Sequence, residues 1–224
     1  DVQAPLRWFR DLYPDLDVDR ATLLGFSFAG QAQLTSFGPL SVPLVSAGSV
    51  AEIVELLTYL PLITTAINAQ FRPNDQGLTV GLWGHTGDRA LDCLAVTYTG
   101  SALLRLLDML VSDALTVTLH LSWSAPVSLN KLAAEMVLAG RLFFDAPMSY
   151  LHVPVNALNE VCRFSDPLAY RLAVAELRRT LDEQSGATSF SKKVRRLLDE
   201  DPGQRSCQRV ADELSVSTST LKRR

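Results

Sequence analysis

The 224-residue sequence contains few cysteines, and their spacing suits neither pairing nor metal binding. Cys93, Cys162 and Cys207 are odd in number and far apart, with no CxxC spacing and no histidine at ligand distance. A disulfide framework and a zinc site are therefore not expected. We expect neither a metal nor a cofactor.

Long apolar runs are also lacking. The most apolar stretch, residues 37–54, is interrupted by proline, glycine and glutamate, so it falls short of the roughly 20 apolar residues that span a bilayer. The chain does not begin with Met or with a basic, apolar and small-residue leader. We expect a cytoplasmic protein with no membrane partner, and a chain that is a fragment.

The composition is that of a globular protein, but its charge is uneven. Hydrophobic residues make up 47% and charged residues 20%, which argues against disorder. Residues 187–224 carry nine Lys or Arg against five acids, a charge of +4, which leaves −7 on the rest of the chain. A basic end on an acidic body favours a polyanionic partner such as nucleic acid, and the alternative is a solvated surface helix.

Hydrophobic periodicity predicts helices and strands in alternation up to residue 184. Expected helices cover 6–12, 50–60, 88–110 with a joint at Gly100, 126–140 and 166–183. Expected strands cover 63–71, 78–83, 116–123, 142–144 and 151–155, the first two joined as an antiparallel hairpin by the turn-rich 72–77. The order predicts an α+β domain over 1–184, with helices packed on a small, mostly antiparallel sheet.

A second, helical unit is expected over 185–224, after a linker at Gly186. Its last two helices would be capped by Ser206 and Ser217, with Cys207 facing their core. A helix-turn-helix needs a small residue in its first helix, a tight turn and an apolar anchor in its second, and Ala211, 215–217 and Leu221 fit these positions. The alternative is an ordinary helical hairpin with a solvated basic face.

These residues resemble the AraC/XylS-type bacterial transcription regulators, whose first helix-turn-helix has the pattern formed here by Val210, Ala211, Leu214, Ser217, Leu221 and Arg223. Segments 24–63 and 143–170 resemble the arabinose-binding-type effector domain of one subgroup. The resemblance implies a metabolite-sensing regulator, more often an activator, that dimerises, contacts RNA polymerase and reads DNA with two helix-turn-helix units. The chain stops at Arg224, inside the first recognition helix, so DNA binding is expected of the intact protein.

The resemblance also assigns DNA-contacting residues. Thr218, Ser219 and Lys222 are expected to approach bases or phosphates, and Arg223 and Arg224 to approach phosphates. Arg223 has an alternative role as a structural ion-pair partner.

An effector pocket is expected between the sheet and the helices, where aromatic rings supply area and polar tips fix orientation. The nominated effector-binding residues are Trp83, His85, Tyr98, His120, Trp123 and Phe143. The alternative is that most of these residues pack in the core or lie on the surface without contacting a ligand. The acidic body and the aromatic side chains together favour a cationic ligand such as an amine.

Two S-x-x-K patterns raise the alternative of a hydrolase, Ser128 with Lys131 and Ser189 with Lys192. Neither SDN nor KTG accompanies them, and Ser128 is interpreted as first-turn residue of the 126–140 helix. We therefore expect no enzyme. A further alternative is a ligand-free dimerisation module, in which the helix at 88–110 or at 166–183 meets a twin subunit.

Overall fold

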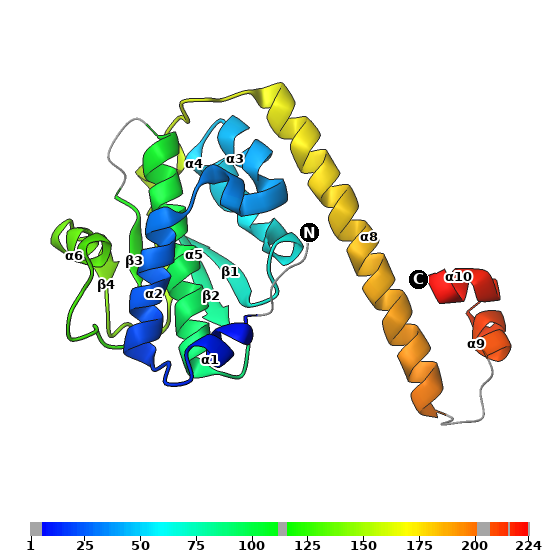
Figure 1. Cartoon of the computed structure of the whole chain (residues 1–224). Helices are drawn as coiled ribbons and strands as arrows, with labels where there is room; N and C mark the ends of the chain where they lie inside the picture. The colour runs from blue at the N-terminus through cyan, green and yellow to red at the C-terminus, as the bar shows by residue number, and fades with distance from the viewer. Residues whose placement is uncertain (1–5, 112–115, 201–206, 215, 224) are drawn as a thin grey trace. The chain divides into compact units, whose positions relative to one another are not determined.

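The computed structural model describes residues 6–111, 116–200, 207–214 and 216–223, with the backbone alone for 185–200, 209, 213 and 221–223 (Figure 1). The chain divides into two units, Asp1–Val174 and Ala175–Arg224. The first unit is an α+β domain, as predicted.

The described strands of the first unit form one sheet with the order β1-β2-β5-β3-β4. Their bounds are β1 Ile67–Asn74, β2 Gly77–Gly84, β3 Thr118–His120, β4 Leu142–Phe143 and β5 Tyr150–Pro154. Neighbours pair antiparallel except β3 and β4, which are parallel, so the sheet is mostly antiparallel, as predicted. The β1–β2 hairpin is also confirmed, but its turn is reduced to Asp75 and Gln76.

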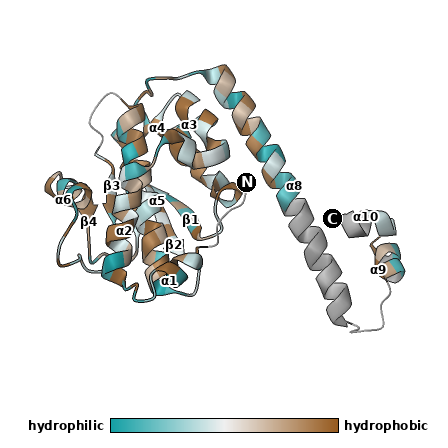
Figure 2. Cartoon of the chain, viewed as in Figure 1, coloured by the Kyte–Doolittle hydropathy of each residue, from teal (hydrophilic) through white to brown (hydrophobic). Residues whose placement is uncertain are grey.

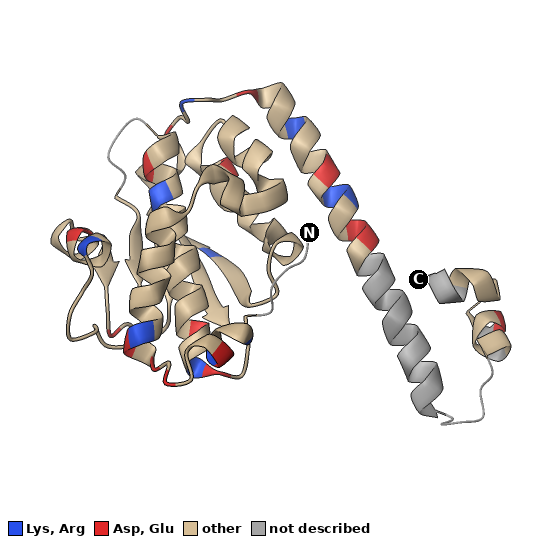
Figure 3. Cartoon of the chain, in the orientation of Figure 1, with Lys and Arg blue, Asp and Glu red and all other residues tan. Residues whose placement is uncertain are grey.

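Helix α5, Arg89–Leu110, lies on one face of this sheet and forms the centre of the core. Its charged residues stand only near its two ends, and Figure 2 and Figure 3 show the uncharged, largely hydrophobic stretch between them. The joint predicted at Gly100 was wrong because the helix is continuous there. Gly100 instead leaves room for Leu119, whose Cδ1 would lie 2.6 Å from an added Cβ.

The burial of α5 bears on two further expectations. By length and composition this helix could span a membrane, yet 72% of the relevant window is buried inside the domain, as in the core helix of a globular fold. The same burial contradicts the alternative that α5 meets a twin subunit. The other helix named for that role, α8 (Pro167–Glu200), does expose apolar side chains, with Leu168 60% and Leu172 65% accessible.

Helix α2, Val18–Gln31, packs along α5 and was not predicted. Asp17 caps its start by accepting a hydrogen bond from the Arg20 amide at 2.8 Å. The helices approach closely at Gly25, where an added Cβ would lie 2.7 Å from the Cβ of Thr97. Arg105 of α5 donates to the Ala29 carbonyl at 2.6 Å, which fixes the other end of the contact.

Short helices occupy the region between α2 and β1: η1 Leu34–Leu40, α3 Ser41–Ser46, α4 Val50–Glu55 and η2 Leu56–Leu62. No element is predicted for residues 34–46, but they are helical, and Gly38 only kinks the chain, with φ +53°. The predicted start of the 50–60 helix is confirmed, since Ser49 accepts from the Glu52 amide. From Leu56 the helix tightens to a 3₁₀ helix.

The remaining elements of the first unit are α1 Trp8–Leu12, α6 Lys131–Leu138 and α7 Val155–Leu158. Helix α6 begins five residues later than predicted because Asn130, not Pro126, precedes it as cap and accepts from the Ala133 amide at 3.0 Å. Ser128 therefore lies before the helix rather than in its first turn, a correction to the prediction.

Helix α8 begins as predicted, with Asp166 accepting hydrogen bonds from the amides of Leu168 and Ala169 at 3.1 and 3.0 Å. It then continues through Gly186 to Glu200, so the linker predicted at Gly186 is helical. Two short helices follow in the second unit, α9 Cys207–Glu213 and α10 Thr218–Arg223.

Candidate functional site

A cavity of about 590 Å³ opens in the first unit beside α5. Side chains of α5, η1, η2 and the start of β1 form its wall, and Leu6, before α1, closes part of it. Leucine is the commonest residue of the lining, which also includes Phe37, Ile63 and Ile67. A volume of this size falls in the range of about 300–1,000 Å³ that small-molecule sites occupy.

The polar groups of this cavity are neutral. None of the described residues that line it is charged, and its polar side chains are hydroxyls: Ser36, Thr64, Thr65, Tyr98 and Thr99. Burial raises the pKa of Tyr98, so its phenol stays protonated at physiological pH and can donate a hydrogen bond. The cavity can accept an apolar body and orient it through a few hydroxyl groups.

A second cavity of about 490 Å³ adjoins the first and shares Phe37, Ala102 and Leu106 with it. Unlike the first, it carries charge, from Arg105 and Asp108. Both carboxylate oxygens of Asp108 accept from Arg141 Nη1 at 2.8 Å. Arg105 makes one hydrogen bond, to the carbonyl of Ala29, and no carboxylate pairs with it among the described residues.

These cavities contain residues that sequence reasoning missed, above all Phe37, Ala102 and Arg105. Ala102 looks like an ordinary core position of a long apolar helix. The signal that was present is Arg105, a lone basic residue among Leu103, Leu104, Leu106 and Leu107. A guanidinium in an apolar helix needs a partner, and the described part of the chain supplies a single one, the Ala29 carbonyl.

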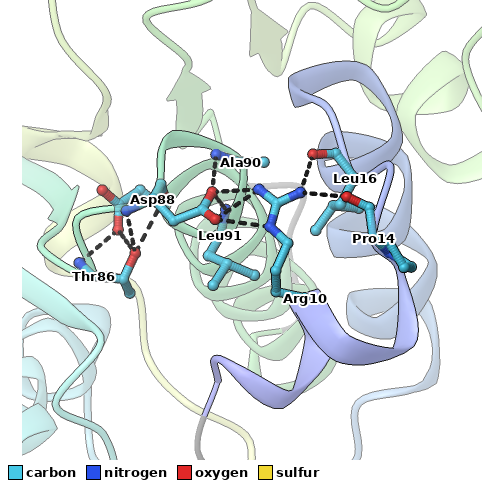
Figure 4. A network of polar contacts seen from close by, with 8 residues as sticks. Arg10, Pro14, Leu16, Thr86, Asp88, Ala90 and Leu91 are labelled. Carbon is cyan, nitrogen blue, oxygen red and sulfur yellow. Dashed lines mark hydrogen bonds and ion pairs between the residues drawn. The ribbon is translucent and has the colours of Figure 1, made fainter.

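An ion pair between Arg10 and Asp88 holds the N-terminal segment beside the larger cavity (Figure 4). Arg10 of α1 donates from Nε and Nη2 to the carboxylate of Asp88 at 2.6 to 2.9 Å, and from Nη1 to the Leu16 carbonyl at 2.7 Å. Asp88 also caps α5, accepting from the amides of Ala90 and Leu91. The Arg10 hydrogen bonds hold the pKa of Asp88 below its ordinary value, despite the opposing effect of burial.

Two substitutions separate the roles of Asp88. Asp88→Ala removes both the cap and the ion pair, and we expect it to lower the free energy of unfolding by about 1–2 kcal/mol. Asp88→Asn keeps a capping oxygen and should cost less. Because the folded-state pKa of Asp88 is lowered, the advantage of wild type over Asp88→Asn is present above pH 3.8 and disappears as the pH falls further. Urea unfolding at several pH values measures this, and an advantage independent of pH would contradict it.

Three of the nominated effector residues lie on the face of the sheet that points away from α5, namely Trp83, His120 and Phe143. His120 stacks between Phe143 and Tyr150, with ring centroids 4.7 and 4.3 Å away, and Trp83 stands on the same face of β2. Burial, and then the nearby His152, lowers the pKa of His120 and favours its neutral form. This aromatic face is separated from the cavity by the sheet itself.

The other nominees occupy three different environments. Tyr98 lines the larger cavity. Trp123 is buried, and its indole N–H donates to Thr22 Oγ1 at 2.8 Å, which places it in the core beside α2. His85 is exposed between β2 and α5 and contacts the Asn68 amide through Nδ1 at 3.1 Å. The six residues therefore do not converge on one site.

The second unit contains a helix-turn-helix arrangement. Val210 and Ala211 of α9 are buried, and the Val216 amide donates to the Ala211 carbonyl at 2.9 Å across the turn. Ser217 caps α10 by accepting from the Thr220 amide at 3.2 Å. Of the residues assigned to DNA, Ser219 is exposed and Thr218 half-buried, while Arg224 and the side chains of Lys222 and Arg223 lie outside the described residues.

This fold is also that of a solved transcription regulator. The chain is similar to the crystal structure of the transcriptional regulator CdpR from Pseudomonas aeruginosa, with a TM-score of 0.60 and 17% sequence identity. The similarity covers 100% of this chain and 79% of that one, and at this identity it shows the fold alone. No protein-family model matches the chain, and no curated protein matches it either.

The alternative of serine–lysine chemistry finds no support in the geometry. No hydrogen bond joins Ser128 to Lys131 among the described residues, and the Lys131 ammonium lies 3.9 Å from Glu135. Ser189 and Lys192 have side chains outside the described residues.

Two of the three cysteines, Cys93 and Cys162, are buried, and the third is exposed. Burial raises the pKa of the Cys93 and Cys162 thiols to about 11, so both stay protonated and unreactive. Cys207 is exposed, which corrects the expectation that it faces the helix-turn-helix core.

Proposed function

We propose that the chain is an effector-responsive transcription regulator, with an effector domain at 1–184 and a DNA-binding unit at 185–224. The observation that carries this proposal is the α9–α10 arrangement, with a buried small residue at Ala211 and a Ser217 cap before α10. The similarity in fold to CdpR, which is described as a transcriptional regulator, supports it. The AraC/XylS resemblance adds activation, RNA polymerase contact and a cytoplasmic location to the proposal.

The larger cavity is the effector site in this proposal. A cation would find no carboxylate among the described residues of its wall, so the geometry does not favour an amine. An apolar body that uses the hydroxyl groups for orientation fits better.

The cavity also contacts the elements that hold the start of α8. Leu56, Leu57 and Leu60 of η2 line it, and η2 directly continues α4. The Tyr170 hydroxyl of α8 donates to the Glu52 carbonyl of α4 at 3.3 Å. Helix α8 begins in the first unit and continues into the second. A ligand that prefers one arrangement of η2 would therefore shift the population of α8 arrangements and with it the presentation of α9 and α10.

Homodimerisation is part of the proposal and is assigned to α8. Leu168 and Leu172 stand one helical turn apart, and both are more than half exposed. A second copy of α8 would cover them.

Selection of double-stranded DNA from a random library by the intact protein tests the proposal. We expect a sequence to be enriched, and Ser219→Asp to weaken its binding about tenfold or more, because a negative charge on α10 would approach phosphates or base edges. Ser128→Asp, at an exposed position of the first unit, is the matched control and should bind as wild type does. An unenriched library, or equal affinity for both variants, would contradict the assignment of α10.

A further inference from the structure

We infer that the effector is an amphiphilic monoanion, with its apolar chain in the larger cavity and its carboxylate on Arg105. This inference rests on the proposed function and specifies the ligand of the same site. It joins two observations on the described residues: those that line the larger cavity leave room but carry no charge, and the adjoining cavity has a cation that none of them pairs with a carboxylate.

The two cavities are neighbours along one side of α5. Phe37 of η1 and Ala102 and Leu106 of α5 belong to the walls of both. Ala102 is the smallest of the three, so the wall that the two cavities share has the fewest side-chain atoms at this position. Arg105 stands one turn further along α5 than Ala102. A chain extended beside Ala102 therefore ends near the guanidinium.

The charged side chains among the described residues of the smaller cavity leave one positive charge uncompensated. Asp108 is neutralised by Arg141, in a two-oxygen contact at 2.8 Å. Arg105 uses only Nη1, on a neutral carbonyl, and its Nε and Nη2 groups make no hydrogen bond among the described residues. Guanidinium N–H groups in this arrangement match the two oxygens of a carboxylate. A second anionic group on the ligand would lie near Asp108, and no further cation among the described lining residues would neutralise it. A ligand with a single negative charge therefore fits best.

Other ligand classes fit this pair of cavities less well. An amine would place its charge beside Arg105, or else in the larger cavity, where no described lining residue carries a carboxylate. A sugar would bury many hydroxyl groups against leucine side chains, leaving most of them without hydrogen bonds. An alcohol with the same chain would fill the larger cavity but leave Arg105 without a counter-ion.

Isothermal titration of the full chain with decanoate, decan-1-ol and decylamine tests the inference, with the two ionic probes below their micelle concentrations and the alcohol below its solubility limit. We expect decanoate to bind at least about tenfold more tightly than decan-1-ol, because hydrogen bonds to charged groups are worth more than neutral ones. Decylamine should bind most weakly. From hexanoate to decanoate, each added methylene should raise the affinity about fourfold.

Arg105→Gln should remove the preference for decanoate over decan-1-ol and leave the alcohol affinity unchanged. Arg89→Gln, on an exposed residue at the other end of α5, is the matched control and should keep the preference. Arg105→Lys, which retains the charge without the paired N–H groups, should keep part of it. If Arg105→Gln does not fold, the three probes on wild type and Arg105→Lys still decide the question.

The inference is overturned if decan-1-ol or decylamine binds wild type as tightly as decanoate does, or if Arg105→Gln keeps the preference. It is also overturned if none of the three probes binds. Each of these outcomes leaves DNA selection by α10 untouched, so the ligand class and the regulator function fail separately.

Discussion

Replacing Gly25 with alanine should lower the free energy of unfolding by about 1–3 kcal/mol. Replacing Gly30, in the same helix, should instead raise it by about 0.4–1 kcal/mol. The two changes add the same methyl group to α2, and alanine is the better helix former at both positions by about 1 kcal/mol. The opposite signs come entirely from what surrounds each new Cβ.

At Gly25 the new Cβ would lie 2.7 Å from the Cβ of Thr97 and 2.9 Å from the Leu94 carbonyl oxygen. Both atoms belong to the rigid, buried part of α5 and cannot move aside without separating the helices. At Gly30 the nearest atoms are Arg105 Nη1 and Leu132 Cδ2, at 3.8 and 3.9 Å, which is ordinary contact.

Urea or thermal unfolding of both variants beside wild type measures the difference. For a chain of this size, 1 kcal/mol corresponds to about 2–4 °C in Tm. Equal effects of the two substitutions would contradict the close approach of α2 and α5 at Gly25.

Replacing Ala102 with phenylalanine should weaken decanoate binding about a hundredfold. The new ring would occupy the wall shared by both cavities and displace three to four methylene groups of the ligand, each worth about 0.8 kcal/mol. Without ligand, the same ring fills empty apolar space, so the free energy of unfolding should rise by about 0.5–2 kcal/mol.

The combination of a more stable protein with a lost ligand separates a blocked cavity from a damaged fold. Calorimetric titration with decanoate and thermal unfolding without it supply the two readouts. Leu138→Phe, on the exposed side of α6, is the matched control and should change neither. A destabilised Ala102→Phe that still binds decanoate would show that the cavity lies elsewhere.

Local signals in the sequence predicted much of this fold. The starts of the helices expected at 50–60 and 166–183, the β1–β2 hairpin and the Ser217 cap of α10 all depend on residues close together in the chain, and each is confirmed. Helix α2 was missed although Asp17 is a good cap and the helix is amphipathic, because the small residues Ala21, Gly25 and Ala29 on its buried face were not recognised as core positions.

The cavity could not be predicted because it depends on distant segments. Its wall comes together only when α5 packs on the sheet, because it includes residues as far apart in the sequence as Leu6, Phe37, Leu60 and Ala102. Aromatic residues were nominated because rings often bind ligands, yet Trp83, His120 and Phe143 follow the alternation of strands onto the face away from α5. Strand alternation alone could not say which face α5 would cover.

The central claim is that a ligand in the cavity beside α5 changes how α9 and α10 meet DNA. Fluorescence anisotropy of a selected DNA, titrated with the intact protein in the absence and presence of saturating decanoate, measures it directly. The account predicts that decanoate changes the DNA affinity of wild type about fivefold or more, as typical coupling free energies do, and leaves that of Ala102→Phe unchanged. The same DNA affinity for wild type with and without bound decanoate would contradict it.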